Sequence, residues 1–583
     1  MDDQDAGPPA ALAICGPVGA KTNQIKIKKI SPHMSFATGR NILVISLFII
    51  LYQTAHSQVM IFSRKDSLRG ALRPERSYDV THYDLHVAVQ PEKKSISGYN
   101  IISYRGLGTC PEMQIDLFDN MKIKSIRAGS KELKWHREYN AVFIQHPLSD
   151  KKEDKIRVDF EGQPIIANKA PWDGGFVWTE DEFKNPWIGV ACEGIGASLW
   201  WPNKDHLSDE PESMDIYVTV PKPLMAISNG HFVEEKPEGK KQTTWHWQVS
   251  YPINNYNVTL YIGKYASFTE DFKTSAGEAM TLRYYVLEPH LTIAKEHFKQ
   301  TAQVLQSFDH YLGPYPFVKD GYALVEAPYL GMEHQSAIAY GNGFMRGYQG
   351  KRIPDDLNFD YIILHESAHE YWGNAVSCTD HADMWIHEGF ATYMEALYVE
   401  YLKGKEAGLK SLEYIRPLIV NQQPILGPKN VNFLDNPSDI YNKGAWVLQT
   451  LRQSFINDTL FFEILKDFYQ QHKMGFATTK DFSDLVTKVS GRDYAPFLRQ
   501  YLKYKTIPKL LYSVTHRDNY TTIKYKWDCY EPDFYLPIDF DMDGRKIQLE
   551  PASNWKNIEF SRDFKKVKPR TRGLLIDVEE VKG

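Results

Sequence analysis

Residues 361–374 read Y-I-I-L-H-E-S-A-H-E-Y-W-G-N, and the interpretation of the whole chain starts from this stretch. Its apolar beginning, Y-I-I-L, is typical of a buried helix. On a helix, His365 and His369 lie about 40° apart and one turn apart, so both imidazoles can reach one metal ion. Glu366 lies beside that face, where its carboxylate can take a proton from an activated water. The alternative is a helix with two unconnected histidines, and a third ligand decides between the two.

Glu388 is the predicted third ligand of a zinc ion, which in catalytic sites takes three protein ligands and keeps one position open. It lies nineteen residues after His369, in D-M-W-I-H-E-G-F-A-T-Y-M-E-A-L, a separation that suits two antiparallel helices and a loop. His387 is the rival ligand, but it points about 100° away on the same helix. Glu395 returns to the face of Glu388; it either orients a ligand histidine or is an ordinary solvated carboxylate.

The spacing of the motif separates two classes of zinc protease. The metzincin pattern needs Gly at position 372 and His at position 375, where this chain has Trp372 and Ala375, so that class is excluded. H-E-S-A-H-E-Y-W-G-N, followed eighteen residues on by W-I-H-E-G-F-A-T-Y, resembles the zinc aminopeptidases of the aminopeptidase N and leukotriene-hydrolase kind. These are gluzincins with the pattern H-E-x-x-H-x18-E. The resemblance implies one Zn²⁺ per chain.

Further stretches make the resemblance specific. Y-L-G-M-E-H-Q-S at 329–336 is similar to the exopeptidase motif G-x-M-E-N of the family, and I-Y-N-K-G-A-W-V-L at 440–448 is similar to its Y-E-K-G-A segment. The likeness extends to Y-D-V-T-H-Y-D-L-H-V from residue 78, to A-C-E-G-I-G-A-S-L-W-W-P-N-K-D at 191–205 and to G-P-Y-P-F at 313–317. It therefore covers nearly all of the chain after the leader.

The resemblance assigns roles to residues that no local pattern singles out. Glu333 matches the glutamate that binds the free α-ammonium of the substrate, and Glu193 matches a second amine anchor. Two carboxylates at the end of a cleft would pair with a charged N-terminus and block longer N-terminal extensions. Gly331 and Met332 precede Glu333 as substrate-binding residues of the same motif. Tyr441 matches the phenol that donates a hydrogen bond to the developing oxyanion.

Some positions depart from the family pattern. Leu330 and His334 replace the first glycine and the asparagine of G-x-M-E-N, so contacts to the peptide are expected to differ. Asn442 replaces the glutamate that follows the catalytic tyrosine. The long helical C-terminal domain of many members is not expected, because only about seventy-five residues follow the catalytic domain. The chain is therefore identified as a short, three-domain, bacterial-type member.

Periodicity divides the chain into domains of different class. Short alternating stretches predict an N-terminal, saddle-like β-sheet domain over 58–268. A period near 3.6 predicts a mainly helical domain over 269–506, which the resemblance makes thermolysin-like. Alternation returns over 507–583 and predicts a small C-terminal β-sandwich. The fold class is thus α+β and multidomain. The expected helices cover 293–312, 357–373, 385–403, 444–456, 460–472 and 480–489.

Residues 1–57 read as a leader with a signal peptide. The apolar run from Ile42 to Tyr52 is eleven residues long, too short to cross a bilayer, which takes about twenty residues. It follows Arg40 and ends in A-H-S, small residues at the −3 and −1 positions of a signal-peptidase site. Cleavage between Ser57 and Gln58 is predicted, with export to the periplasm or beyond and no stable membrane span in the mature chain. Met34 is an alternative start.

Composition excludes several classes of protein. With 583 residues, 43% hydrophobic and 24% charged, the chain can bury large cores, which excludes disorder, collagen and coiled coil. A net charge of −5 provides no field that recruits nucleic acid. Five cysteines without a C-x-x-C pair exclude a disulfide scaffold and a zinc ribbon.

The predicted function is that of a zinc-dependent aminopeptidase, which hydrolyses the N-terminal peptide bond through a zinc-activated water. The partners expected are peptides with a free N-terminus and no nucleic acid. Two alternatives stay open: a secreted thermolysin-like metalloendopeptidase, which shares the zinc site, and an exported binding module with a decayed site. An epoxide hydrolase activity exists in part of the resembled family, but no residue here identifies a lipid cavity.

Overall fold

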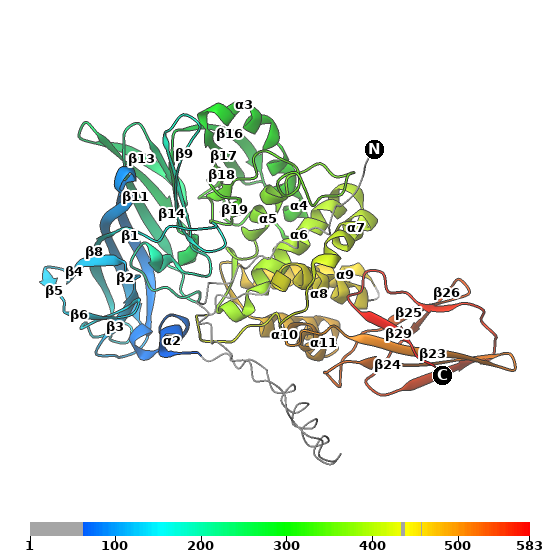
Figure 1. The fold of residues 1–583 in the computed structure, drawn as a ribbon. Helices are drawn as coiled ribbons and strands as arrows, with labels where there is room; N and C mark the ends of the chain where they lie inside the picture. The colour runs from blue at the N-terminus through cyan, green and yellow to red at the C-terminus, as the bar shows by residue number, and fades with distance from the viewer. Residues whose placement is uncertain (1–61, 433–437, 456, 583) are drawn as a thin grey trace, which may run out of the picture.

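The chain, seen in a computed structural model, is described over residues 62–432, 438–455 and 457–582. The expected leader and its cleavage site lie outside these residues. No helix within them combines the length and the apolar character that crossing a membrane requires. A β domain, a largely helical domain and a second β domain follow one another along the chain (Figure 1). This order confirms the predicted multidomain α+β fold.

The N-terminal domain is built around a twisted eight-stranded sheet. Its strand order is β13-β14-β11-β1-β2-β8-β4-β5. The bounds are β1 Tyr78–Gln90, β2 Ser95–Gly106, β4 Met121–Ala128, β5 Lys131–Glu132, β8 Glu153–Gly162, β11 Ser213–Pro221, β13 His231–Glu238 and β14 Gln242–Val249. Burial alternates along β1 and β11, so one face of the sheet forms the core, as the period-two pattern predicts.

Two smaller sheets complete this domain. One has the order β12-β15-β10-β9 and the other β3-β7-β6. The bounds are β3 Met113–Asp116, β6 Trp135–Glu138, β7 Ala141–Ile144, β9 Gly175–Glu180, β10 Pro186–Ala191, β12 Met225–Ser228 and β15 Leu260–Gly263. A short helix, α2 (Arg64–Gly70), precedes the first strand. The turn that follows β10 carries Glu193.

The chain passes into the second domain at Lys264. Strand β15 still pairs within the N-terminal domain, whereas β16 (Tyr265–Lys273) pairs with β17 (Ala279–Leu287) along its whole length. The predicted boundary after residue 268 therefore falls inside β16. Three short strands extend the new sheet to the order β16-β17-β18-β20-β19. They are β18 Tyr322–Glu326, β19 Gly331–Met332 and β20 Ile338–Tyr340.

Nine α-helices follow within the described part of the second domain. Their bounds are α3 Leu291–His297, α4 Gln300–Leu312, α5 Tyr361–His369, α6 Trp385–Lys403, α7 Lys405–Ile415, α8 Asn442–Ser454, α9 Asp458–His472, α10 Thr479–Ser490 and α11 Ala495–Leu502. A two-stranded ladder joins β21 (Val376–Cys378) to β22 (Gly475–Ala477). Helix α6 has the predicted bounds, whereas the expected helix over 293–312 is divided into α3 and α4. Phe298, between them, is buried against Tyr340 with ring centroids 4.9 Å apart.

The C-terminal domain consists of two packed sheets, as predicted. Their orders are β27-β24-β23-β29 and β26-β25-β28. The bounds are β23 Lys509–Arg517, β24 Tyr520–Asp528, β25 Ile538–Met542, β26 Arg545–Leu549, β27 Lys556–Phe560, β28 Val567–Pro569 and β29 Asp577–Glu580. The rings of Tyr512 and Phe540 meet between the sheets, 5.7 Å apart. Near residue 575 this domain bonds to the helical one, since the Tyr501 hydroxyl donates to the Leu575 carbonyl oxygen at 2.9 Å.

Candidate active site

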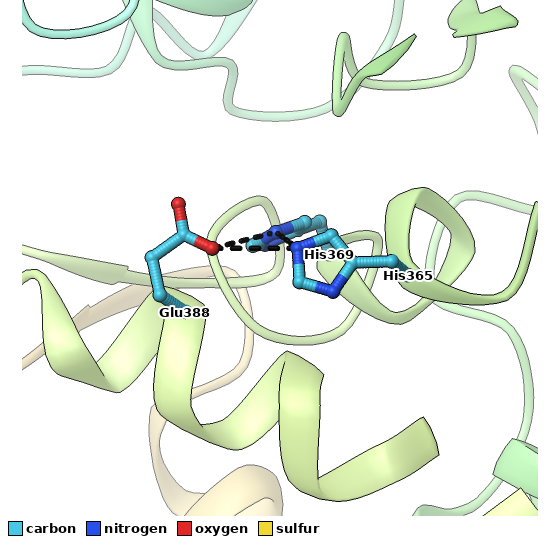
Figure 2. A group of neighbouring side chains, drawn as sticks. All are labelled: His365, His369 and Glu388. Carbon is cyan, nitrogen blue, oxygen red and sulfur yellow. Dashed lines mark hydrogen bonds and ion pairs between the residues drawn. The ribbon is translucent and has the colours of Figure 1, made fainter. Parts of the chain in front are cut away.

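Helices α5 and α6 bring three potential metal ligands to one point. Asp360 caps α5, and its carboxylate accepts a hydrogen bond from the Ile362 amide at 2.9 Å. The Nε2 atoms of His365 and His369 lie 3.2 Å apart. Glu388 Oε2 lies 3.4 Å from the first and 3.3 Å from the second. Figure 2 shows both rings pointing toward this carboxylate, with the dashed lines meeting between the two helices.

The surroundings of these side chains fit a bound cation. His365 Nδ1 donates to Glu395 Oε1 at 2.8 Å, and His369 Nδ1 donates to the Trp372 carbonyl oxygen at 2.8 Å. A neutral imidazole that donates through Nδ1 keeps its Nε2 lone pair for another partner. Two lone pairs thus face each other beside Glu388 Oε2, which is buried without a hydrogen-bond partner among the described residues. Two imidazoles and one carboxylate are the donor set that zinc takes in catalytic sites.

Glu395 is a buried hydrogen-bond partner of the predicted ligand His365 and not a solvated carboxylate. It is 6% exposed and accepts hydrogen bonds from His365 Nδ1 at 2.8 Å and from the Tyr348 hydroxyl at 3.0 Å. Such outer partners fix the tautomer and direction of a ligand imidazole. The rival ligand His387 points elsewhere, because its Nε2 accepts a hydrogen bond from the Cys378 amide at 2.8 Å.

Glu366 lies against a strand edge. A side chain at Gly331 would place its Cβ 2.5 Å from Glu366 Oε1 and 2.8 Å from Ile362 Cγ2, so any larger residue would displace the strand or these side chains. Gly331 and Met332 form β19, the last strand of the five-stranded sheet. An extended peptide can add to such an edge through its backbone. Burial raises the pKa of Glu366 to about 8, although His365 and His369 act to lower it.

Glu333 faces the same point from the loop after β19. Its carboxylate, a Glu366 oxygen and a His369 nitrogen all lie within 4.8 Å of one another. The Tyr256 hydroxyl, from the N-terminal domain, donates to Glu333 Oε1 at 3.1 Å, and Asn374 Nδ2 donates to the Glu333 carbonyl oxygen at 2.8 Å. Glu333 is 3% exposed, and burial raises the pKa of its carboxyl. The carboxylate is thus held beside the predicted ligands.

Glu193 comes from the N-terminal domain and is half-buried. Burial first, and then the charges of Glu333 and Glu388, raise the pKa of Glu193 well above its ordinary value. The charges that act on its carboxylate include those of the predicted metal ligands Glu388 and His365. Because the charge of Glu333 raises the pKa of Glu193, a cation that binds near both carboxylates would be favoured.

Tyr441 immediately precedes α8. Its ring centroid lies 6.1 Å from that of His365. Burial, followed by the charge of Glu388, raises the pKa of its phenol well above the ordinary value, so the hydroxyl keeps its proton and can donate it in a hydrogen bond. Helices α6 and α8 approach closely here, because a Cβ built on Gly444 would lie 2.9 Å from Gly389 Cα. This contact brings the ends that carry Glu388 and Tyr441 together.

A hydrogen-bond network around Glu370, which the sequence did not predict, supports the site. Glu370 accepts from the Ser336 amide at 3.0 Å, from the Tyr315 hydroxyl at 2.5 Å and from Asn374 Nδ2 at 3.1 Å. It joins α5 to the loop that carries Glu333. Glu370 and Asn374 stand one and five residues after His369, so their place in the zinc motif was a signal for a supporting role.

Two of the three departures from the family pattern, Leu330 and His334, lie around the same loop. His334, in place of asparagine, is fully buried, and its Nδ1 donates to the Tyr261 hydroxyl at 2.7 Å. Burial lowers the pKa of His334 to about 3, so the ring is neutral. The imidazole therefore packs against the N-terminal domain rather than lying among the predicted ligands. Leu330, in place of glycine, is half-buried at the start of the loop.

Comparisons with known sequences agree with this geometry. Residues 296–501 match the family described as "Peptidase family M1 domain". "Probable aminopeptidase 2" of Sulfurisphaera tokodaii is 22% identical over 483 residues, which cover 79% of this chain and 59% of that protein. "Aminopeptidase N" of Lactobacillus helveticus is 22% identical over 479 residues, covering 74% of this chain and 52% of that protein. The chain thus spans between half and three fifths of these relatives.

Solved structures share the fold. The M1 zinc metallopeptidase of Deinococcus radiodurans superimposes with a TM-score of 0.63 at 22% identity, over 76% of this chain and 98% of its own. Legionella pneumophila aminopeptidase A, in complex with aspartic acid, gives a TM-score of 0.70 at 17% identity, over 87% of this chain and 60% of its own. At these identities the likeness concerns the fold.

Proposed function

We propose that this chain, which carries an M1 peptidase family domain over residues 296–501, is a zinc-dependent aminopeptidase. The observation that carries the proposal is the position of Glu333. Its carboxylate lies within 4.8 Å of a Glu366 oxygen and a His369 nitrogen, beside the cluster of His365, His369 and Glu388. A fixed carboxylate next to a hydrolytic centre selects a substrate with a cationic end.

Zinc is the cofactor that this proposal requires, with one ion per chain held by His365, His369 and Glu388. When bound, zinc supplies a Lewis acid that polarises the scissile carbonyl and makes water more acidic. Glu388 Oε2, which is buried and has no hydrogen-bond partner in the described part of the chain, and the two facing imidazole lone pairs support this assignment.

Residues of the chain carry out substrate binding, proton transfer and stabilisation of the oxyanion. Glu333 and Glu193 bind the α-ammonium group and fix the substrate's N-terminus. Glu366 accepts a proton from the attacking water and passes it to the leaving amine. The phenol of Tyr441 donates a hydrogen bond to the developing oxyanion. The backbone of Gly331 and Met332, at the sheet edge, aligns the peptide.

Comparison of blocked and unblocked substrates tests the function. We expect the purified protein to cleave aminoacyl fluorogenic amides with free amines, to leave their N-acetyl counterparts intact, and to lose this activity to a chelator until zinc is restored. Equal cleavage of N-acetylated internal peptides would instead favour the metalloendopeptidase. Binding of peptides without turnover, in the zinc-loaded protein, would favour a decayed binding module.

Glu333→Ala tests the anchor separately from the metal site. The variant should retain zinc and lose at least tenfold in kcat/KM on free-amine substrates, since a charge-assisted contact to the substrate is lost; about 1.4 kcal/mol corresponds to tenfold. Glu463→Ala, an exposed glutamate on α9, is the matched control.

We further propose that the protein is exported after cleavage between Ser57 and Gln58. The basic flank, the apolar run and the small residues that follow occur in the order of a signal peptide. N-terminal sequencing of the mature protein from its native cell should give Gln58 as the first residue. A mature chain that retains residues 1–57 would overturn the proposal.

A further inference from the structure

Arg69 connects the N-terminal helix to two other parts of the molecule. It is the penultimate residue of α2, and its side chain is 13% exposed. Its Nη1 donates to the Gly194 carbonyl oxygen at 2.7 Å and to Asn432 Oδ1 at 2.7 Å. Gly194 directly follows the amine anchor Glu193, and Asn432 belongs to the helical domain. One guanidinium group therefore joins the catalytic domain to residues 192–198, the loop that carries Glu193 and is called the anchor loop below.

A buried carboxylate completes the arrangement. Arg69 Nε lies 3.1 Å from Asp205 Oδ2, and the side chain of Asp205 is 5% exposed. The same oxygen accepts hydrogen bonds from the Ser198 amide at 3.1 Å and the Ser198 hydroxyl at 2.5 Å. The ion pair thus holds both ends of the 194–198 segment. A buried arginine–carboxylate pair has a defined geometry because the guanidinium presents its donors in a rigid fork.

The anchor loop packs tightly against the ion pair of Arg69 and Asp205. Gly196 has a φ of +103°, and a Cβ at this position would lie 2.2 Å from Asp205 Oδ2 and 2.5 Å from Arg69 Cζ. The Gly196 amide also bonds to the Cys192 carbonyl oxygen at 2.8 Å, which closes the turn that carries Glu193. The backbone conformation of this turn therefore depends on where the Arg69 guanidinium group lies.

Helix α2 is fixed at its other side. The Asn432 amide donates to the Asp66 carbonyl oxygen at 2.8 Å. A Cβ at Gly70 would lie 2.2 Å from the Val431 carbonyl carbon, so the two backbones touch. These contacts fix the position of α2, and therefore of Arg69, which bonds to the anchor loop.

We propose that Arg69 is a positioning residue for substrate binding, which sets the direction in which Glu193 faces the α-ammonium group. The inference rests on the proposed aminopeptidase function. Arg69 does not touch the substrate; it acts by fixing the Gly194 carbonyl oxygen and, through Asp205, the far end of the loop. Loss of the guanidinium should leave zinc and Glu366 in place and weaken recognition of the free amine.

A double-mutant cycle tests this role. Four zinc-loaded proteins are compared on one free-amine substrate: wild type, Arg69→Ala, Glu193→Ala and the double variant. We expect Arg69→Ala to raise KM about tenfold, with kcat changed less than threefold and zinc content unchanged, and to have no further effect once Glu193 is alanine. Arg69→Lys, which keeps the charge beside Asp205, should recover part of the wild-type KM.

Arg64→Ala is the matched control, because Arg64 lies on the same helix and pairs with Glu138 at the surface. It should leave KM unchanged. An equal effect of Arg69→Ala with and without Glu193 would overturn the inference, as would an unchanged KM in Arg69→Ala. If Arg69→Ala does not fold, Arg69→Lys in the two backgrounds carries the same cycle. Turnover by the wild type alone tests the proposed function, so the two failures are distinguishable.

Discussion

At the residue scale, the candidate site depends on the hydrogen bonds that fix the tautomer and direction of each histidine ring. The Nδ1 atoms of His365 and His369 are engaged by Glu395 and by the Trp372 carbonyl oxygen, which leaves both Nε2 lone pairs available. Glu388 Oε2 is buried next to them, and none of the described residues gives it a hydrogen bond. Burying such groups costs several kcal/mol unless they are paired. A cation at this point would satisfy all three at once.

Glu366→Gln separates proton transfer from metal binding. The amide has the size of the carboxylate but cannot accept a proton, so we expect kcat to fall about a hundred- to ten-thousandfold. Zinc content, measured by atomic absorption, should remain that of the wild type, because Glu366 is not among the proposed ligands. Glu463→Gln, on the exposed face of α9, controls for the change of charge. A variant with normal turnover would remove Glu366 from the mechanism.

Gly331→Ala tests the fit between the strand edge and Glu366. The added methyl would lie 2.5 Å from Glu366 Oε1, so strand and carboxylate must move apart. A displacement of about 1 Å at a reacting group can cost about a hundredfold in rate, and we expect a loss of kcat of that order. The control is Gly108→Ala, where the new Cβ meets its nearest neighbour at 3.4 Å. Unchanged kinetics would show that the contact of β19 with Glu366 does not position the carboxylate for the reaction.

At the scale of elements, the close contact of α6 and α8 determines the distance between Glu388 and Tyr441. The Cβ that would be added at Gly389 lies 3.0 Å from Gly444 Cα and 3.0 Å from the Ile440 carbonyl oxygen. Packed helices usually stay about 8–10 Å apart, and small residues allow the closest approach. The glycine pair therefore positions two residues of the candidate site as well as packing the core.

Gly444→Ala should destabilise the protein although alanine is the better helix former. In an unconstrained helix the change would stabilise by about 1 kcal/mol. Here overpacking is expected to cost about 1–3 kcal/mol, so the thermal midpoint of unfolding should fall, and kcat should fall with it as Tyr441 moves away. The sign of the change in midpoint is the test. A higher thermal midpoint with full activity would mean that α6 and α8 accommodate the added methyl group without moving apart.

At the scale of the whole molecule, the candidate site is assembled where the first two domains meet. The N-terminal domain supplies Glu193, and its Tyr256 hydroxyl bonds to Glu333 at 3.1 Å. Asn229 Nδ2 donates to the Gln335 carbonyl oxygen at 2.8 Å, and the Gly230 amide donates to Ser336 Oγ at 2.7 Å. The loop that carries Glu333, a proposed amine anchor, is thus held by residues of both domains.

Glu210 should make this interface sensitive to pH. The Ser377 hydroxyl, in β21, donates to Glu210 Oε1 at 2.5 Å, and burial raises the pKa of Glu210 to about 8. An unfolded glutamate titrates near about 4.3, so between these pH values the folded protein holds a proton that the unfolded chain has lost. Stability contributed by Glu210 is complete below about pH 4.3 and is lost as pH rises through 8, by up to about 1.4 kcal/mol per pH unit.

Glu210→Gln removes this titration and keeps the shape of the side chain. The difference in thermal midpoint between wild type and variant should therefore shift in favour of the variant as pH rises from 5.5 to 7.5. Ser377→Ala, which retains the carboxyl, should keep a pH dependence of the wild-type sign. Parallel midpoint curves for wild type and Glu210→Gln would show that Glu210 is ionised in the folded protein.

The sequence determined the features that depend on local periodicity. The spacing of His365, His369 and Glu388 predicted their meeting, because one helical turn places the two imidazoles on one face, and α6 has the predicted bounds. The family resemblance is confirmed by the M1 match. Strands β18 to β20 were not predicted, since they are short and buried and show no alternation.

Only the tertiary structure decided which distant residues share the site. Glu193 and Glu333 are 140 residues apart in the sequence, and no periodicity relates them; the resemblance alone indicated both. The contacts of Tyr256 with Glu333, of Asn374 with the Glu333 backbone and of Arg69 with Gly194 follow from how the domains pack. Helical spacing is fixed by bonds between near neighbours in the chain. Contacts between domains depend on the burial of surfaces that lie far apart in it.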